Sequence, residues 1–223
     1  MHEVILIRHA EVMHDWKSRC YGAMDVPLSQ AGILASQQRA DELALGPAPV
    51  RILHSGLQRT QCLAAMIGEH FPATPIIEVP ALRERDYGGW QGKNWDEVYA
   101  SDPDFHNVIH QPDTYRPPGG ETTREMQVRV VSWFESLLSP ESSDWLVSGP
   151  IIAISHSGPM AALAGHCLEL HATEWGPWMV RYLDALHFRP GSGAVAVTLH
   201  SPASPYSSEG PTAADRMRLN KNP

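Results

Sequence analysis

Four side chains with the chemistry to bind and transfer an anionic group stand in three short segments of this sequence. Arg8 and His9 occupy the first segment, Arg59 the second and His156 the third. An imidazole can act as a nucleophile or exchange a proton near neutral pH, and a guanidinium presents fixed donors that match phosphate oxygens. Taken singly, a histidine after a strand is usually structural, and an arginine at a helix start is usually solvated. The joint placement of the four favours a functional site.

Each of these segments follows a mostly aliphatic run that indicates a strand, and the runs at 4–7 and 151–154 are typical of strands buried on both faces. The three runs are residues 4–7, 50–53 and 151–154. Because ligands collect at the carboxyl ends of the strands in an open α/β sheet, we expect His9 and His156 at the same edge. Arg59 falls in the first turn of the following helix, where the helix dipole disfavours a cation. An anion shared between the guanidinium and the helix would explain this placement.

Further apolar runs continue the alternation of strands and helices along the chain. We expect additional strands at 76–79, 186–188 and 195–197, and helices at 33–45, 57–71, 121–138 and 159–168. Strands that alternate with helices indicate βαβ units. The pattern predicts an α/β fold, a three-layer α/β/α sandwich with a mostly parallel central sheet. The last two strands are expected to form a hairpin around Gly191-Ser192-Gly193.

The domain prediction is one α/β domain over residues 1–200, followed by a Ser/Pro-rich C-terminal tail over 201–223 that has little to bury. Residues 87–120 are rich in Trp, Pro, Gly and Asp, and we expect an irregular segment over one end of the sheet. Trp90 and Trp95 in this segment are candidates for the mouth of the site, the alternative being loop packing.

The overall charge argues against one class of binding partner. The chain has 223 residues, with 17 Lys+Arg against 25 Asp+Glu, a net charge of −8 with histidines neutral. This balance argues against a nucleic-acid protein held by phosphate contacts across a basic face. The apolar run at 4–7 is interrupted by Arg8 and is far too short to span a bilayer, so no membrane partner is expected.

Cysteine and histidine spacing argues against a bound cofactor. Three widely spaced cysteines, Cys20, Cys62 and Cys167, form no disulfide framework and no CxxC pair, which favours a reducing, cytoplasmic compartment. The sequence has no HExxH motif or cysteine cluster for a metal. No Gly-rich nucleotide-binding loop follows a strand. We therefore expect neither a metal nor another cofactor.

The segment LIRHAE at 6–11 closely resembles the RHG signature of the histidine phosphatase (phosphoglycerate mutase-like) superfamily. Five further segments are similar to that family's motifs and occur in its order: PLSQAG at 27–32, SGLQRT at 55–60, LRERDYGGWQG at 82–92, PGGET at 118–122 and SHSG at 155–158. Six motifs in order, spread over about residues 4–190, form a specific signal. The resemblance implies a phosphoglycerate mutase-like fold.

The resemblance also implies a role for each matched residue. His9 aligns with a nucleophile that carries a phosphoryl group on a ring nitrogen, while Arg8, Arg59 and His156 align with the residues around the phosphate. Neighbouring cations favour the neutral imidazole that such a nucleophile needs. Glu84 aligns with the proton donor to the leaving oxygen. Judged by its neighbours alone, Glu84 would instead be an ion-pair partner of an adjacent arginine.

Several further residues are candidates for phosphate contacts. They are Ser55, Arg85, and Ser157 through its backbone N–H, although either serine could equally be a turn residue. Asp15 departs from the family pattern, since many relatives carry an asparagine there that donates to the phosphate. An ionised carboxylate cannot donate and would repel the anion, so Asp15 must point away or meet a cation or hydroxyl of the substrate.

The function predicted from the resemblance is a phosphatase that hydrolyses a small phosphomonoester through phospho-His9. Its partner would be a small phosphorylated metabolite, and residues 20–28 look most like the α-ribazole phosphatase-like branch. A phosphoglycerate mutase is the first alternative, but the short segment between Glu84 and the PGGET motif leaves the site open to water and favours hydrolysis. A non-catalytic phospho-ligand binding or regulatory module is the second. The oligomeric state stays open between monomer and homodimer.

Overall fold

The computed structural model describes residues 3–139, 149–191 and 194–202. In this part of the chain, six strands form one sheet in the order β3-β2-β4-β1-β5-β6. The strands are β1 (Val4–Arg8), β2 (Arg51–His54), β3 (Ile76–Glu78), β4 (Ile151–Ser155), β5 (Ala185–Pro190) and β6 (Val195–His200). The first four strands run parallel, whereas β5 pairs antiparallel with β1 and β6 antiparallel with β5. The sheet is therefore mostly parallel.

Strand β1 lies beside β4 in the centre of the sheet, and every residue of both strands is buried. Their register pairs Leu6 with Ala153 and Arg8 with Ser155. The residues that leave the two strands, His9 and His156, consequently start from neighbouring positions at the same edge. This register confirms that the two strand ends meet, as the apolar runs predict.

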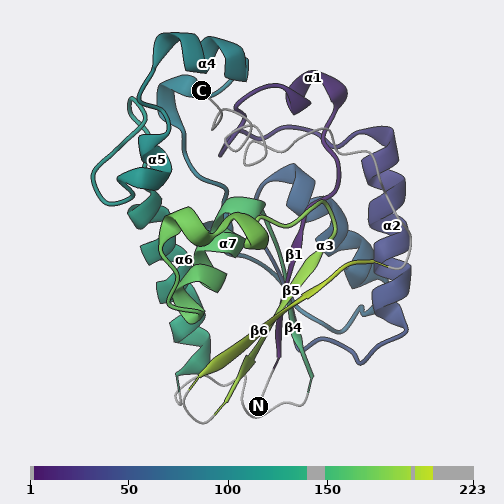
Figure 1. Cartoon of the computed structure of the whole chain (residues 1–223). Coiled ribbons are helices and arrows are strands. Elements are labelled where there is room, and N and C mark those ends of the chain that lie inside the picture. Colours follow the sequence, from purple (N-terminus) through teal and green to yellow (C-terminus); the bar gives the residue numbers. More distant parts are fainter. Residues whose placement is uncertain (1–2, 140–148, 192–193, 203–223) are drawn as a thin grey trace.

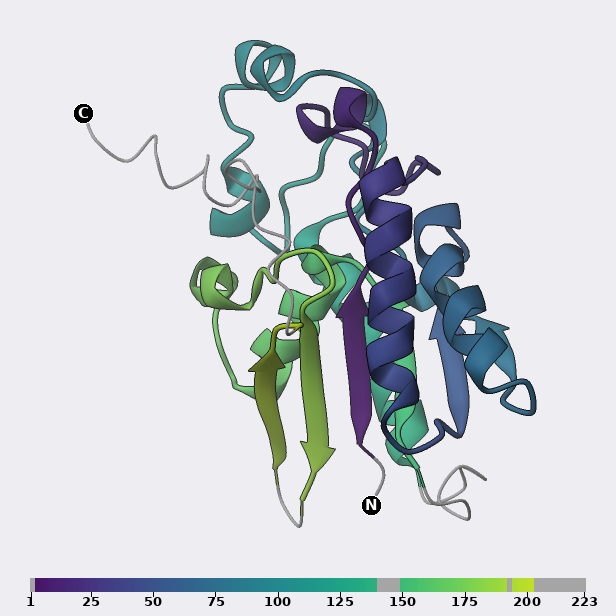
Figure 2. The same ribbon diagram turned by 90° about the vertical axis from the view of Figure 1, so that its right-hand side faces the viewer.

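Two helical layers cover the two faces of the sheet (Figures 1 and 2). Ile5 and Ile7 pack with helices α2 (Gln30–Ala44) and α3 (Gln58–His70) on one side. Val4 and Leu6 pack on the other side with α6 (Thr123–Leu138) and α7 (Ser157–Cys167). Since successive side chains of a strand point to opposite faces, an unbroken aliphatic strand needs helices on both. The predicted three-layer α/β/α sandwich is confirmed.

Side-chain caps fix where two of these helices begin. Ser29 accepts a hydrogen bond from the Gly32 N–H at the start of α2. Thr122 and Glu125 form a capping box at the start of α6, each side chain accepting from the other residue's backbone N–H. These caps satisfy N–H groups that have no partner within the helix. They place α6 two residues later than the predicted start at 121.

Residues 87–120 are more regular than predicted. They contain α4 (Trp95–Ser101), α5 (Asn107–His110) and a 3-10 turn at Gly88–Trp90. Together with Cys20, this segment forms a third hydrophobic cluster beyond the carboxyl ends of the parallel strands, next to α1 (His14–Lys17) (Figure 1). Trp90 and Trp95 are buried within it. They pack this cluster rather than line the mouth of a site.

The remaining elements lie at the edges of the sheet. Strand β3 is short and exposed at one edge, and further 3-10 turns occupy Pro80–Leu82, Ala172–Glu174 and Gly176–Trp178. The β5–β6 hairpin is confirmed, but its predicted turn includes residues 192–193, which lie outside the described residues. Most of the predicted tail, 203–223, also lies outside them, so the division at residue 200 stays a prediction. No helix in the described part of the chain is long and apolar enough to cross a membrane.

Candidate active site

The ends of β1 and β4 bring Arg8, His9 and His156 together. The backbone N–H of His9 donates to the Ser155 carbonyl oxygen at 3.0 Å, which couples the two strand ends. The imidazole rings of His9 and His156 lie edge to face, with 5.0 Å between their centroids. Arg59, the second residue of α3, reaches the same point. The exposed fractions of these four residues are 8% or less, so the cluster is buried.

The hydrogen bond of His9 determines which of its ring nitrogens can react. Nδ1 lies 2.6 Å from the carbonyl oxygen of Ala10. A carbonyl oxygen only accepts, so Nδ1 carries the hydrogen and Nε2 carries the lone pair. Burial, followed by the charges of Arg59 and Arg8, lowers the pKa of His9 well below its ordinary value. His9 is therefore a neutral imidazole with an available Nε2.

Arg59 joins α3 to the segment that follows Cys20. Its Nη1 and Nη2 donate to the carbonyl oxygens of Met24 and Gly22 at 2.5 and 2.7 Å, and its Nε donates to His156 Nδ1 at 3.3 Å. The guanidinium also lies 5.2 Å from the centroid of the Tyr21 ring. The guanidinium thus stays beside His156 inside the cluster, where its charge acts in a medium of low dielectric constant.

Tyr182 belongs to the site but was not predicted from the sequence. The guanidinium carbon of Arg8 lies 4.1 Å from the centroid of the Tyr182 ring, and the His9 ring lies 5.6 Å from it. Arg8 Nη1 also donates to the Val180 carbonyl oxygen at 2.8 Å. The antiparallel direction of β5 is the signal from which Tyr182 could have been predicted as a site residue. The residues that enter an antiparallel neighbour of β1 lie at the same edge as those that leave β1.

The backbone beside Tyr182 has an unfavourable conformation. Leu183 has a φ of 63°, a left-handed conformation that a branched, non-glycine side chain rarely adopts. Two hydrogen bonds hold it, from the Leu183 N–H to the Arg8 carbonyl and from the Arg8 N–H to the Asp184 carbonyl, both 3.1 Å. These bonds fix residues 180–184 against the end of β1, and with them the ring of Tyr182.

Glu84 reaches the site from the loop after the 3-10 turn at Pro80–Leu82. Its carboxylate accepts from the backbone N–H groups of Arg85 at 2.9 Å and Gly158 at 3.4 Å, the latter in the first turn of α7. Arg129 of α6 holds the loop, because its Nη2 donates to the Glu84 carbonyl at 3.2 Å and also bonds the Glu121 carboxylate. Sequence patterns did not identify Arg129, which lies within a regular helix.

Arg85 does not match its predicted role in binding phosphate. Its side chain is buried and donates to the Glu121 carbonyl oxygen at 3.0 and 3.2 Å and to Thr123 Oγ1 at 2.5 Å. The guanidinium also lies 5.2 Å from the centroid of the Tyr87 ring. Arg85 therefore joins the 82–92 loop to the start of α6. Its position next to Glu84 in the sequence was misleading, since consecutive residues of an extended loop point in different directions.

Ser55 also differs from its predicted role as a phosphate contact. It is fully buried behind His156, with Oγ 2.9 Å from Nε2 of that ring. Ser157 is the first residue of α7 and partly buried, so its backbone N–H belongs to the helix N-terminus beside His156. Asp15 lies on α1 and is exposed. The structure thus brings Arg8, His9, Arg59, Glu84 and His156 to one place, with Ser55 supporting them.

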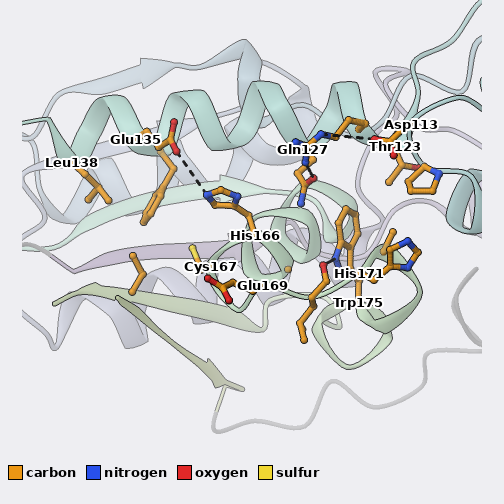
Figure 3. Close-up of a pocket in the computed structure, with 17 residues that line it drawn as sticks. Asp113, Thr123, Gln127, Glu135, Leu138, His166, Cys167, Glu169, His171 and Trp175 are labelled. Carbon is orange, nitrogen blue, oxygen red and sulfur yellow. Dashed lines mark hydrogen bonds and ion pairs between the residues drawn. The ribbon is translucent and has the colours of Figure 1, made fainter. Parts of the chain in front are cut away.

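A separate cavity of about 620 Å³ lies between α6 and the C-terminal end of α7 (Figure 3). It includes His166, Cys167 and Trp175, and none of the predicted site residues lines it. His166 Nε2 lies 3.8 Å from the Glu135 carboxylate. Among the described residues, no group of three or more His, Cys, Asp or Glu is arranged to hold a metal ion.

Comparison with curated proteins places the chain among phosphate-ester enzymes. A metal-independent phosphoserine phosphatase of Arabidopsis thaliana is 27% identical over 189 residues, 84% of this chain and 76% of the relative. A glucosyl-3-phosphoglycerate phosphatase of Mycolicibacterium vanbaalenii is 28% identical over 175 residues, 77% of this chain and 76% of the relative. A 2,3-bisphosphoglycerate-dependent phosphoglycerate mutase of Gloeobacter violaceus is 29% identical over 158 residues, 70% of each chain.

The fold and the family are established separately. The crystal structure of the α-ribazole phosphatase from Shigella flexneri superposes with a TM-score of 0.74, covering 88% of this chain and 95% of that one. At 20% identity this likeness confirms the phosphoglycerate mutase-like fold and says nothing of the substrate. The model of the histidine phosphatase superfamily, branch 1, matches residues 4–200. The chain therefore belongs to branch 1 of the histidine phosphatase superfamily.

Proposed function

We propose that this phosphatase hydrolyses a small phosphomonoester in two steps through a phosphohistidine on His9. The observation that carries the proposal is the hydrogen bond from His9 Nδ1 to the Ala10 carbonyl. It holds the hydrogen on Nδ1 and leaves Nε2 unprotonated, with a lone pair for the attack on phosphorus. The two flanking arginines supply the charge that a transferring phosphoryl group needs.

In the first step, Nε2 of His9 attacks phosphorus and the bond from phosphorus to the ester oxygen breaks. The electron pair of that bond stays on the leaving oxygen, which takes a proton from the carboxyl group of Glu84. This step requires Glu84 in its protonated form at the moment of transfer. Arg8 and Arg59 stabilise the charge on the three equatorial oxygens.

In the second step, water attacks the phosphohistidine. Glu84, now a carboxylate, takes a proton from the water as the new bond to phosphorus forms. The bond between phosphorus and nitrogen breaks, its electron pair returns to Nε2, and inorganic phosphate leaves. The enzyme returns to its starting protonation state, and the two steps together consume one water molecule.

The substrate is proposed to be a small phosphorylated metabolite. The relatives carry names that specify phosphoserine and glucosyl-3-phosphoglycerate, both of which place a carboxylate near the phosphate. A cluster buried to this degree suits a terminal phosphate on a compact molecule better than a phosphate within a polymer. The net charge of −8 also opposes long polyanions.

Phosphate release from a panel of phosphomonoesters tests the proposal: phosphoserine, glucosyl-3-phosphoglycerate, α-ribazole phosphate and 3-phosphoglycerate. We expect release from at least one, with kcat reduced at least a thousandfold in His9→Asn. Conversion of 3-phosphoglycerate to 2-phosphoglycerate as the dominant reaction would instead identify a mutase, as in the Gloeobacter relative. Binding of inorganic phosphate without turnover of any ester would identify a non-catalytic module.

A further inference from the structure

Four buried side chains, those of Thr60, Ser55, His156 and Arg59, form a continuous chain of hydrogen bonds that ends at the Leu57 carbonyl. Thr60 Oγ1 donates to the Leu57 carbonyl oxygen at 2.8 Å, and Ser55 Oγ lies 3.0 Å from Thr60 Oγ1. Ser55 Oγ also lies 2.9 Å from His156 Nε2. On the other side of the ring, Arg59 Nε donates to Nδ1 at 3.3 Å. Ser55, Thr60 and His156 have no exposed surface, so protein groups rather than bulk water decide the hydrogen positions.

Each hydrogen in this chain has one consistent position. Thr60 Oγ1 donates its single hydroxyl hydrogen to the Leu57 carbonyl, which also accepts from the backbone N–H groups of Thr60 and Gln61. Thr60 Oγ1 must then accept from Ser55, which uses the hydroxyl hydrogen of that serine. Ser55 Oγ consequently accepts from His156 Nε2, which therefore carries a hydrogen. Arg59 Nε can only donate, so it requires a lone pair on His156 Nδ1. The tautomer with its hydrogen on Nε2 provides that lone pair.

We propose that Thr60 is a positioning residue that sets the tautomer of His156 through Ser55. With Nε2 kept protonated, Nδ1 keeps the lone pair that accepts from Arg59 Nε. The consequence for turnover rests on the proposed function, whereas the tautomer itself does not.

Without the Thr60 hydroxyl, the hydroxyl hydrogen of Ser55 loses its acceptor. Ser55 can then donate to His156 Nε2 instead of accepting from it, and the ring changes to the tautomer with hydrogen on Nδ1. That N–H would face the N–H of Arg59 Nε, two donors without an acceptor between them. The guanidinium would have to move from its place beside His156, which weakens its alignment with a bound phosphate.

The test compares Thr60→Val, which removes the hydroxyl at nearly constant shape, with Thr60→Ser, which keeps it. Nitrogen-15 NMR of labelled protein distinguishes the two neutral tautomers, and the His156 signal is assigned by its loss in His156→Asn. We expect the Nε2–H form in the wild type and in Thr60→Ser, and a substantial Nδ1–H population in Thr60→Val. Loss of one buried hydrogen bond should also lower kcat about five- to tenfold in Thr60→Val, with Thr60→Ser restored to near wild-type values.

Ser36→Ala is the matched control, because Ser36 is another fully buried serine, bonded to the Gly32 carbonyl within α2. It should leave the His156 tautomer and kcat unchanged. Thr60→Ala replaces Thr60→Val if the valine variant does not fold. An unchanged Nε2–H tautomer in the folded variant overturns the proposal. A tautomer change in a protein without phosphatase activity would support it and count against the proposed function alone.

Discussion

The Glu84 carboxylate accepts a hydrogen bond from the Gly158 backbone N–H at 3.4 Å, two residues after His156. A side chain at position 158 would overlap a carboxylate oxygen of Glu84, so glycine is what allows this approach. The contact links the loop after the Pro80–Leu82 turn to the first turn of α7. It brings a carboxyl group, otherwise distant in the chain, to the cluster of Arg8, His9 and His156.

Replacement of Glu84 by glutamine should lower kcat about 10²- to 10⁴-fold, because the amide cannot transfer a proton to the leaving oxygen. The effect should be large for alkyl esters and much smaller for 4-nitrophenyl phosphate, whose leaving group departs readily as an anion. Steady-state kinetics with both substrates check this. Glu78→Gln is the matched control, since Glu78 is half-exposed and pairs with Arg83 at 3.2 Å. Equal losses for the two substrates would contradict proton donation.

A second variant moves the same carboxylate without altering it. Gly158→Ala should displace Glu84 and lower kcat about tenfold for alkyl esters, while inhibition by inorganic phosphate stays nearly unchanged. The reason is that the new methyl group occupies the space of the carboxylate and leaves Arg8 and Arg59 in place. Kinetic assays with phosphate as inhibitor test this. A weaker phosphate affinity with unchanged kcat would show that position 158 acts on the phosphate instead.

Arg85 should behave as a structural residue. Arg85→Met is expected to lower the free energy of unfolding by about 2–3 kcal/mol, because the buried acceptors at Glu121 and Thr123 lose their donor. Inhibition by inorganic phosphate should stay within about twofold of the wild type. Arg59→Lys, by contrast, should weaken phosphate inhibition at least tenfold. Urea unfolding and inhibition assays separate the two effects, and a large loss of phosphate affinity in Arg85→Met would restore its predicted role as a phosphate ligand.

Much of this arrangement follows from the sequence, for a physical reason. Aliphatic runs buried on both faces identify β1 and β4, and the parallel register then fixes His9 beside His156. The order of the motifs similarly identifies Glu84. These features depend on the period of the apolar residues and on the strand direction, both of which a sequence displays.

Other features depend on where single side chains turn in space, and the sequence does not display them. Arg85 and Glu84 are adjacent in one motif, yet Arg85 points toward α6 while Glu84 points toward α7. Tyr182 reaches the site because Leu183 adopts a left-handed conformation that hydrogen bonds to Arg8 hold in place. Trp90 and Trp95 stand in a segment with weak periodicity, where short helices form mainly through their packing against Cys20 and Phe105.

The buried histidines make stability depend on pH in a definite direction. Burial and the neighbouring arginines lower the pKa values of both His9 and His156 well below the ordinary value. Below about pH 6.5 the unfolded chain binds a proton at each position and the folded protein does not. The free energy of unfolding should therefore fall as the pH decreases from 6.5, by up to about 1.4 kcal/mol per pH unit for each histidine. The contribution of the two histidines to the slope fades as the pH rises above 6.5 and vanishes well above it.

Urea unfolding at pH 8, 7, 6 and 5.5 measures this dependence. His9→Asn and His156→Asn should each reduce the slope below pH 6.5, and His70→Asn, at an exposed position outside the cluster, is the control. A wild-type slope that persists in both buried-site variants would show that other groups are responsible.

The most direct test of the central claim is the capture of the phosphoryl group on His9. The protein is mixed with a phosphorus-32-labelled ester that it hydrolyses, quenched, and digested to locate the label, with Glu84→Gln used in parallel to slow hydrolysis of the intermediate. We predict an acid-labile, alkali-stable label on the peptide that contains His9, and none in His9→Asn. Label on another residue, or turnover that survives in His9→Asn, would contradict the phosphohistidine mechanism.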